Sequence, residues 1–289
     1  MTSRAQCVAA AFKWACLAEL DAPKPGNVHV FAAGHRMTAE NFIHSANAAA
    51  APLSADGARV GARILGAVEA TFAAVGANTN LGIILLCAPL AAAAGADAAS
   101  SVLRTALGEV LRGLDVGDAK LAFRAIVTAA PAGLGHSARH DVFAPATVSL
   151  LQAMTEAAER DRVARQYATD YADIFDLGLP LFESVRQDET DAKWATLAIF
   201  LGFLAAFPDS HILRKFGAEK AAAVQGEAVK FQTQLRTARR PAELLPALLA
   251  WDAALKAEGV NPGTTADLTV ATLFAYRLRS ILPPALNSD

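Results

Sequence analysis

The chain has 289 residues, a formal net charge of −2 at pH 7 and a hydrophobic fraction of 54%. A chain of this length can bury a sizeable core, and its balanced charge lacks the basic surface expected of a nucleic-acid-binding protein. Charged residues make up only 19%, and alanine, the strongest helix former, supplies much of the apolar excess, so the composition favours a compact helical body.

Apolar residues recur at helical spacing from the N-terminus onward. Ser3 and Gln6 form a capping box for a first helix that runs to about Leu20. Pro23 and Pro25 end this helix, because proline cannot donate a backbone hydrogen bond and disfavours helix at the residue before it. The starts of the next two helices are marked by Thr38, Ser54 and Asp56.

The rest of the chain continues the helical pattern. Ile83–Ala94 is almost purely apolar and is predicted to form a central buried helix. The charged stretch Glu156–Arg165 is interpreted as a solvated helix face or a connection. The other predicted helices cover about residues 98–112, 118–130, 167–182, 190–207, 218–237, 241–256 and 267–281, and one more begins at Pro145.

No segment alternates with period two between hairpin turns, and no repeat or flexible linker divides the chain. The sequence therefore predicts an all-α fold, formed by a single compact multi-helix domain over residues 1–289.

The cysteines and the N-terminal residues indicate the cellular compartment in which the protein is expected. Cys7, Cys16 and Cys87 are odd in number, lie in apolar helical contexts and lack the spacing of a metal site. They are typical of reduced core thiols. Lys13 and Glu19 interrupt any apolar core of a signal peptide. We therefore expect a cytoplasmic protein.

The longest uncharged run, Ala70–Ala96, has the length of a membrane span, which needs about 20 apolar residues. Polar residues and a proline interrupt it, at Asn78, Thr79, Asn80 and Pro89. The sequence therefore predicts no membrane partner.

The polar turn within this run is Ala77–Gly82. Burying its small polar side chains unpaired would cost about 1–3 kcal/mol each. Such a turn can open a helix whose unpaired N–H groups favour an anion, and its glycine allows close approach. The alternative is a polar kink satisfied within the protein. The candidate ligand-binding residues are Asn78, Thr79, Asn80 and Gly82.

Two other polar segments, Pro23–His29 and Asn261–Asp267, flank apolar helices. Lys24 could meet a phosphate, and His29 could hold a metal-bound water or act as an acid or base. For each, the alternative is an ordinary exposed loop residue. We predict that these segments and Ala77–Gly82 converge on one ligand, a nucleotide phosphate with its metal. The candidate ligand-binding residues here are Lys24, Gly26, Asn27, Gly263 and Thr264, and Asp267 is a candidate carboxylate.

A fourth polar segment, Phe207–His211, follows an apolar helix and is followed by Arg214. Asp209 and its neighbours could ligate magnesium and clamp a phosphate. The alternative is a helix N-cap beside surface basic residues. Glu69, alone on an apolar helix, is a candidate inward carboxylate, with an exposed polar position as its alternative.

Together these segments resemble the triphosphoribosyl-dephospho-CoA synthase family. The matching motifs, in the family's order, are Pro23–Gly26, Asn78–Gly82, Asp209–Arg214 and Pro262–Asp267. The resemblance implies an all-helical transferase that uses ATP with magnesium in cofactor biosynthesis. Its reaction joins the 5-triphosphoribosyl group of ATP to the 2′-hydroxyl of dephospho-CoA and releases adenine.

The resemblance also implies chemical roles. Asp209 and Asp267 would hold Mg²⁺ on the triphosphate or activate the attacking hydroxyl, and Glu69 is a further candidate metal ligand. His29 or His211 would shuttle a proton. Because the transferred ribose passes through an oxocarbenium-like state, positioning and charge stabilisation should supply most of the rate.

Phosphates would be positioned by Lys24, the Asn78–Gly82 turn and Arg214. Asn80 and Leu81 stand where the usual family turn has histidine and lysine, which makes the chain similar to a divergent branch in archaea and methylotrophic bacteria. Two alternatives therefore stay open. One is ATP-dependent action on another acceptor in one-carbon carrier biosynthesis, of the methanopterin or methanofuran type. The other is a non-catalytic helical protein that binds a phosphorylated ligand. Homo-oligomer formation is also left open.

Overall fold

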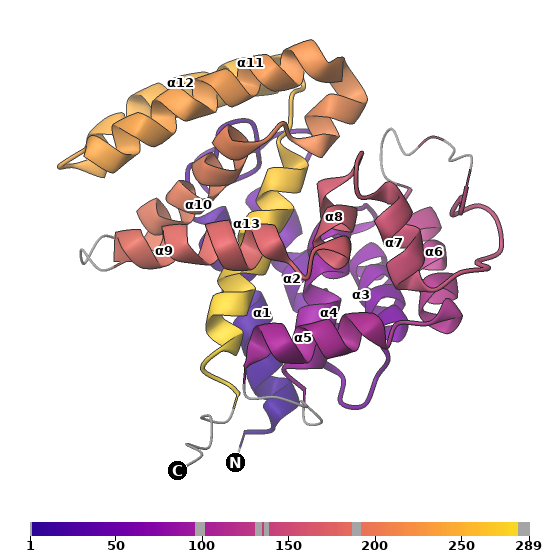
Figure 1. Cartoon of the computed structure of the whole chain (residues 1–289). Coiled ribbons are helices and arrows are strands. Elements are labelled where there is room, and N and C mark those ends of the chain that lie inside the picture. The colour runs from indigo at the N-terminus through magenta and orange to yellow at the C-terminus, as the bar shows by residue number, and fades with distance from the viewer. Residues whose placement is uncertain (1, 96–101, 131–134, 136–138, 187–191, 283–289) are drawn as a thin grey trace. The chain divides into compact units, whose positions relative to one another are not determined.

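The computed structural model describes residues 2–95, 102–130, 135, 139–186 and 192–282, which form helices joined by loops (Figure 1). These residues contain no strand, and their only extended pairings are isolated bridges between His29 and Ala32 and between Gly34 and Met37. The all-α prediction is confirmed.

Contacts within the chain group it into two compact units. The first comprises Met1–Ala15, Ile43–Ala172 and Phe274–Asp289, and the second comprises Cys16–Phe42 and Asp173–Leu273. The single domain over residues 1–289 stays a prediction.

Three helices contribute residues to both units: α1 (Arg4–Leu20), α2 (Ala39–Ser54) and α13 (Gly263–Leu278). The capping box predicted for the first of them forms, because Ser3 N donates to Gln6 Oε1 at 2.8 Å and Gln6 N donates to Ser3 Oγ at 3.2 Å. The other helices of the first unit are α3 (Val60–Val75), α4 (Leu81–Ala93), α5 (Leu103–Arg112), α6 (Val116–Ala129), α7 (Leu150–Ala157) and α8 (Arg162–Ala168).

Helix α4 is the predicted buried apolar helix, and all its residues except Gly82 and Ala92 are buried. Pro89 lies within it and has no N–H for the carbonyl of Leu85, four residues earlier. The buried hydroxyl of Tyr167 donates to Leu85 O at 2.6 Å instead. The proline is therefore tolerated because α8 supplies the missing donor.

The second unit is built around another buried helix, α10 (Ala192–Ala206). Its apolar core includes Leu197, Leu201 and Leu204, packed with residues of the helices that follow. Figure 1 shows two of these, α11 and α12, running side by side, and Phe231 and Trp251 stack with ring centroids 5.0 Å apart. The elements are a π-helix (Asp173–Gly178), α9 (Leu179–Arg186), α11 (Ser210–Thr237), a 3₁₀-helix (Pro241–Leu244) and α12 (Leu245–Ala257).

The predicted helix over residues 167–182 is wrong. Helix α8 ends at Ala168, and Asp170 and Tyr171 have positive φ angles of 49° and 58°. Tyr171 N donates to Gln166 O at 2.8 Å, and its hydroxyl donates to Leu86 O at 3.0 Å. The local bond to Gln166 and the tertiary bond to Leu86 together favour a reversal that the apolar spacing does not indicate. The predicted starts at residues 98 and 190 lie outside the described residues.

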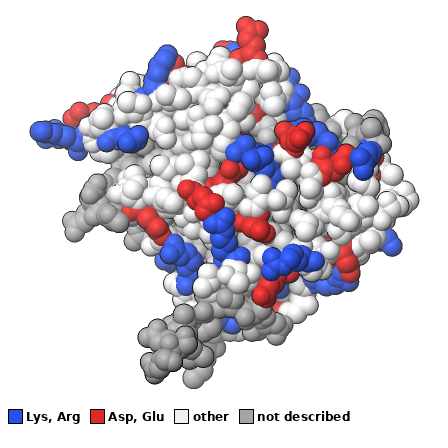
Figure 2. Space-filling model, viewed as in Figure 1, with Lys and Arg blue, Asp and Glu red and all other residues white. Residues whose placement is uncertain are grey.

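No single helix in the described part of the chain is long and apolar enough to cross a membrane. The α10–α11 pair, bent by 48°, passes a test of length and composition only when taken together. Figure 2 shows basic and acidic side chains interspersed on the viewed face. Cys7, Cys16 and Cys87 are not joined in disulfide bonds.

Replacing Tyr167 with Phe should reduce the free energy of unfolding by about 1–3 kcal/mol, because the buried Leu85 carbonyl then has no donor. Tyr171→Phe is the matched control and should cost less, because Leu90, unlike Pro89, has an N–H for Leu86 O. Urea denaturation measures both. Equal losses in the two variants would contradict this account.

Candidate functional site

Lys24 lies in the loop after α1 and is fully buried. Its Nζ donates to Glu19 Oε1 at 2.5 Å, Asn27 Oδ1 at 3.1 Å and Val28 O at 2.7 Å. A lysine ammonium has three donors, so this arrangement uses all of them. Burial lowers the pKa of Lys24, and the facing Glu19 carboxylate opposes that shift. Lys24 is thus placed to shape the loop, and its phosphate-binding role stays a prediction.

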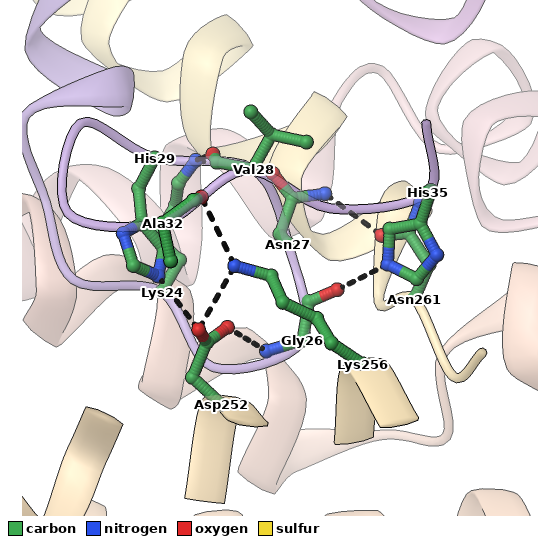
Figure 3. Close-up of polar contacts among 10 residues, drawn as sticks. All are labelled: Lys24, Gly26, Asn27, Val28, His29, Ala32, His35, Asp252, Lys256 and Asn261. Atoms are coloured by element: carbon green, nitrogen blue, oxygen red, sulfur yellow. Dashed lines mark hydrogen bonds and ion pairs between the residues drawn. The ribbon is translucent and has the colours of Figure 1, made fainter. Parts of the chain in front are cut away.

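Gly26 brings this loop against α12 and the following turn. Its φ is +81°, and an added Cβ would lie 2.8 Å from Pro262 Cδ and 3.0 Å from Leu255 Cδ1. Only glycine fits there without strain. In Figure 3, Gly26 N donates to Asp252 Oδ1 at 2.8 Å. Asn27 Nδ2 makes a second link by donating to Asn261 Oδ1 at 2.8 Å.

Asp252 joins several parts of this region. Besides Gly26 N, its carboxylate accepts from Lys256 Nζ at 2.9 Å, and Lys256 also donates to Ala32 O at 3.1 Å. Burial would raise the pKa of Asp252, but the approach of His29 and Lys256 lowers it below its usual range. Sequence reasoning missed both residues. The only available signal was an Asp–Lys pair four residues apart on a predicted helix.

His29 is buried, with 1% of its surface exposed. Its Nε2 lies 3.3 Å from Asp252 Oδ2, an ion-pair distance, but neither ring nitrogen has a hydrogen bond of acceptable geometry. Burial lowers the pKa of His29, and Asp252 opposes this shift. The imidazole is therefore neutral at pH 7 and chemically able to accept a proton.

Asp209 connects two helix starts. Its Oδ1 accepts from His211 N at 2.8 Å and Ile212 N at 3.1 Å, which caps α11. Its Oδ2 accepts from both N and Oγ1 of Thr265 in α13, each at 2.7 Å. The side chain is buried, and burial raises the pKa of Asp209 while these four bonds oppose the rise. Asp209 thus ties the start of α11 to the start of α13, and its catalytic and metal-binding roles stay predictions.

His211, one of the predicted catalytic residues, lies against the start of α13. A Cβ on Gly263 would be 3.0 Å from His211 Nδ1, so glycine at this position makes room for the ring. Burial, followed by the charges of Arg214, Lys215 and His35, lowers the pKa of His211 to about 4. Thr264 is buried beside Gly263 in the first turn of α13.

The Asn78–Gly82 turn lies in the first unit, at the start of α4. Asn78 Oδ1 accepts from Leu81 N at 3.1 Å, and Thr79 Oγ1 donates to Ser45 Oγ at 2.6 Å. Asn80 is buried and its Nδ2 has no hydrogen-bond partner. The turn is thus partly satisfied within its own unit, and its phosphate-binding role stays a prediction.

The predicted metal ligands are Asp209 and Asp267 in the second unit and Glu69 in the first. No group of three or more His, Cys, Asp and Glu side chains within the described residues could hold a metal ion. Every oxygen of Asp209 is already hydrogen-bonded, and Glu69 lies on the surface 3.5 Å from Arg124. Asp267 is half-buried and is the fifth residue of α13. Because Mg²⁺ is usually held by one or two carboxylates together with substrate phosphates, the metal-binding role of these residues stays a prediction.

Three of the predicted polar segments meet inside the second unit. Asn27 and Gly26 link the Pro23–His29 segment to the Asn261–Asp267 segment. Asp209 and His211 link the Phe207–His211 segment to the same Asn261–Asp267 segment. The fourth, Asn78–Gly82, belongs to the first unit. The second unit therefore holds most of the candidate site.

The comparisons with known proteins bear on this arrangement. Residues 5–284 match the family model CitG, described as ATP:dephospho-CoA triphosphoribosyl transferase. The chain belongs to this family. The CitG family is a family of transferases, so the chain is an enzyme of that class.

A crystal structure of a provisionally named triphosphoribosyl-dephospho-CoA synthase from Archaeoglobus fulgidus resembles the chain, with a TM-score of 0.61 and 24% identity. The match covers 80% of this chain and 95% of the archaeal one, and it supports the fold alone. No curated protein matches the chain.

Replacing Lys24 with Met should reduce the free energy of unfolding by about 3–5 kcal/mol, because the buried Glu19 loses its partner. Adding Glu19→Gln should recover part of that loss. Lys230→Met is the control: Lys230 pairs with Glu227 on the surface, where a salt bridge contributes about 0–1 kcal/mol. Urea denaturation compares the variants. A double variant less stable than Lys24→Met would contradict the pairing.

Proposed function

We propose that the protein transfers the 5-triphosphoribosyl group of ATP to the 2′-hydroxyl of 3′-dephospho-CoA and releases adenine. The observation that carries this proposal is the family match over residues 5–284, which names both substrates. The meeting of the three polar segments in the second unit supports it, because they carry imidazole, carboxylate and ammonium groups.

The reaction breaks the bond between C1 of the ribose of ATP and the adenine nitrogen, and forms a bond from C1 to the acceptor oxygen. The hydroxyl proton leaves the acceptor and a proton ends on adenine, so atoms and charge balance. Cleavage produces an oxocarbenium-like ribose. Holding donor and acceptor in line, and placing charge beside that ribose, would supply most of the acceleration.

Among the predicted carboxylates, Asp267 is the better candidate for contact with a substrate. It is half-buried, whereas Asp209 is 1% exposed and bonded through both oxygens. In this proposal Asp267 accepts the proton of the attacking hydroxyl. Magnesium on the triphosphate would enter as part of the ATP substrate, and no step is assigned to a protein-held ion.

Incubation with ATP, magnesium and 3′-dephospho-CoA should release free adenine in equal amount to the new CoA derivative, as measured by chromatography and mass spectrometry. Formation of ADP or AMP with a pterin or furan precursor would favour the alternative acceptor. Unchanged ATP with every acceptor would contradict an ATP-dependent transfer and favour a binding protein.

Replacing Asp267 and replacing Asp209 should have different effects on activity and on stability. Asp267→Asn should lower the rate of adenine release by about 10²–10⁴-fold, the usual range for loss of a general base, and thermal unfolding checks that the variant folds. Asp209→Asn should lower the melting temperature, because its amide would point a donor at the donors of Thr265. Full activity of Asp267→Asn would remove that residue from the mechanism.

A further inference from the structure

The tight turn that begins at His29 carries two large apolar side chains at its tip. His29 N donates to Ala32 O at 3.3 Å and Ala32 N donates to His29 O at 3.1 Å, which leaves Val30 and Phe31 between the paired ends. Val30 is 52% exposed and Phe31 is 43% exposed. Tips of such short turns usually carry Gly, Asn, Asp or Pro. Departures from local preference of this kind are expected at functional sites.

Both sides of this turn are held by other parts of the second unit. Val30 N donates to Leu20 O, at the end of α1, at 3.0 Å, and the His29 side chain is buried. On the other side of the tip, Lys256 Nζ of α12 donates to Ala32 O at 3.1 Å, a contact drawn in Figure 3. Because the backbone of the turn is already fixed, a ligand that binds at the tip would order little additional structure.

The Phe31 side chain is oriented by the buried imidazole of His29. The two ring centroids lie 5.8 Å apart and the ring planes are tilted by 57°, a separation typical of aromatic pairs. This contact holds one part of the Phe31 ring against the protein, and the exposed part remains open to solvent. The ring of Phe31 is therefore both oriented and accessible.

The turn itself is uncharged at neutral pH. Between Val28 and Gly34 the only titratable side chain is that of His29, and burial lowers the pKa of this imidazole so that it is neutral at pH 7. The ammonium group of Lys256, which approaches the turn, is paired with Asp252 at 2.9 Å. Strong phosphate binding depends on charged donors. The tip therefore suits an uncharged group with a flat apolar face better than a phosphate.

This turn is continuous with the polar segments that meet in the second unit. Phe31 lies two residues after the Pro23–His29 segment, which contacts the Asn261–Asp267 segment through Gly26 and Asn27. Figure 3 shows His29 and Ala32, on either side of the tip, in the same loop as Gly26 and Asn27. The tip and one of the polar segments thus belong to a single loop, and one substrate can contact both.

We propose that Phe31 is a stacking platform for the adenine base of a substrate. The platform rests on the proposed function, because both of its substrates, ATP and 3′-dephospho-CoA, carry adenine. Adenine is flat and uncharged, and nucleic-acid bases stack on exposed aromatic side chains in this way. Phe31 holds the base while the polar segments hold the rest of the substrate. It is a binding residue that orients the substrate and takes no part in proton transfer.

Isothermal titration calorimetry with ATP, and with inorganic tripolyphosphate, which has no base, tests the platform. Phe31→Ala should weaken ATP binding by about 5–150-fold, the range for loss of a stacked base, and should leave tripolyphosphate binding unchanged. Phe31→Tyr should keep the ATP affinity, whereas Phe31→Leu should lower it, because leucine is apolar but has no ring face. Phe72→Ala is the matched control: Phe72 lies on α3 in the first unit, is 44% exposed, and its replacement should change neither affinity.

Titration of the same variants with 3′-dephospho-CoA assigns the stacked base to ATP, to the acceptor or to both, and thermal unfolding checks that each variant folds. Unchanged affinity for both substrates in Phe31→Ala, or an equal loss for ATP and tripolyphosphate, would overturn the platform. So would an equal loss in Phe72→Ala. A changed oligomeric state of Phe31→Ala in light scattering, with unchanged affinities, would also overturn it and assign the tip to contact between copies of the chain.

The platform and the proposed function can fail separately. Adenine release by wild-type protein, with the affinities and KM values for both substrates unchanged in Phe31→Ala, would reject the platform while the proposed function stands. Binding of ATP or 3′-dephospho-CoA that depends on the ring of Phe31, without adenine release by wild type, would keep the platform and reject the proposed function.

Discussion

The buried carboxylate of Asp209 is the constraint on which the candidate site depends. A carboxylate removed from water is costly unless its oxygens are hydrogen-bonded. Asp209 meets that requirement with two N–H groups of α11 and with the N–H and hydroxyl of Thr265 in α13. One side chain thereby caps α11 and fixes where α13 begins, 56 residues later in the sequence. His211, Gly263 and Asp267 owe their places to that bond.

A second buried network holds the Pro23–His29 loop, which contacts the Asn261–Asp267 segment at the start of α13. Lys24 is neutralised by Glu19, and Asp252 is bonded to Gly26 N and Lys256. Breaking a buried pair leaves an uncompensated charge, so such a network specifies one loop conformation. Lys24, which the sequence suggested as a ligand-binding residue, thus helps to fix the conformation of the loop through buried contacts. In the proposed function, the half-buried His211 and Asp267 are the candidates for contact with a substrate.

The sequence predicts the helices well because apolar spacing records which face of each helix is buried. The capping box at Ser3 and the buried helix at Leu81–Ala93 are local features and were predicted correctly. The reversal at Asp170 and Tyr171 was not, because it depends on contacts with Gln166 and with Leu86 in α4. Local propensity yields there to tertiary hydrogen bonds.

The site is predictable only in part, for a related reason. The sequence singles out Lys24 and Asp209 because they are polar residues in apolar surroundings. Whether each side chain contacts a ligand or other parts of the protein depends on partners that are distant in the sequence. Thr265 lies far from Asp209 in sequence, and Asp252 resembles an ordinary polar residue on a helix. The family resemblance identified the reaction class and left these roles undetermined.

A crystal structure of the protein with ATP bound tests the proposed active centre directly. The nucleotide is expected on the second unit, against the turns that contain His211 and Gly263, with its phosphates beside Arg214. A nucleotide bound elsewhere, with these turns making no contact to it, would contradict the claim that the joined polar segments form the active centre.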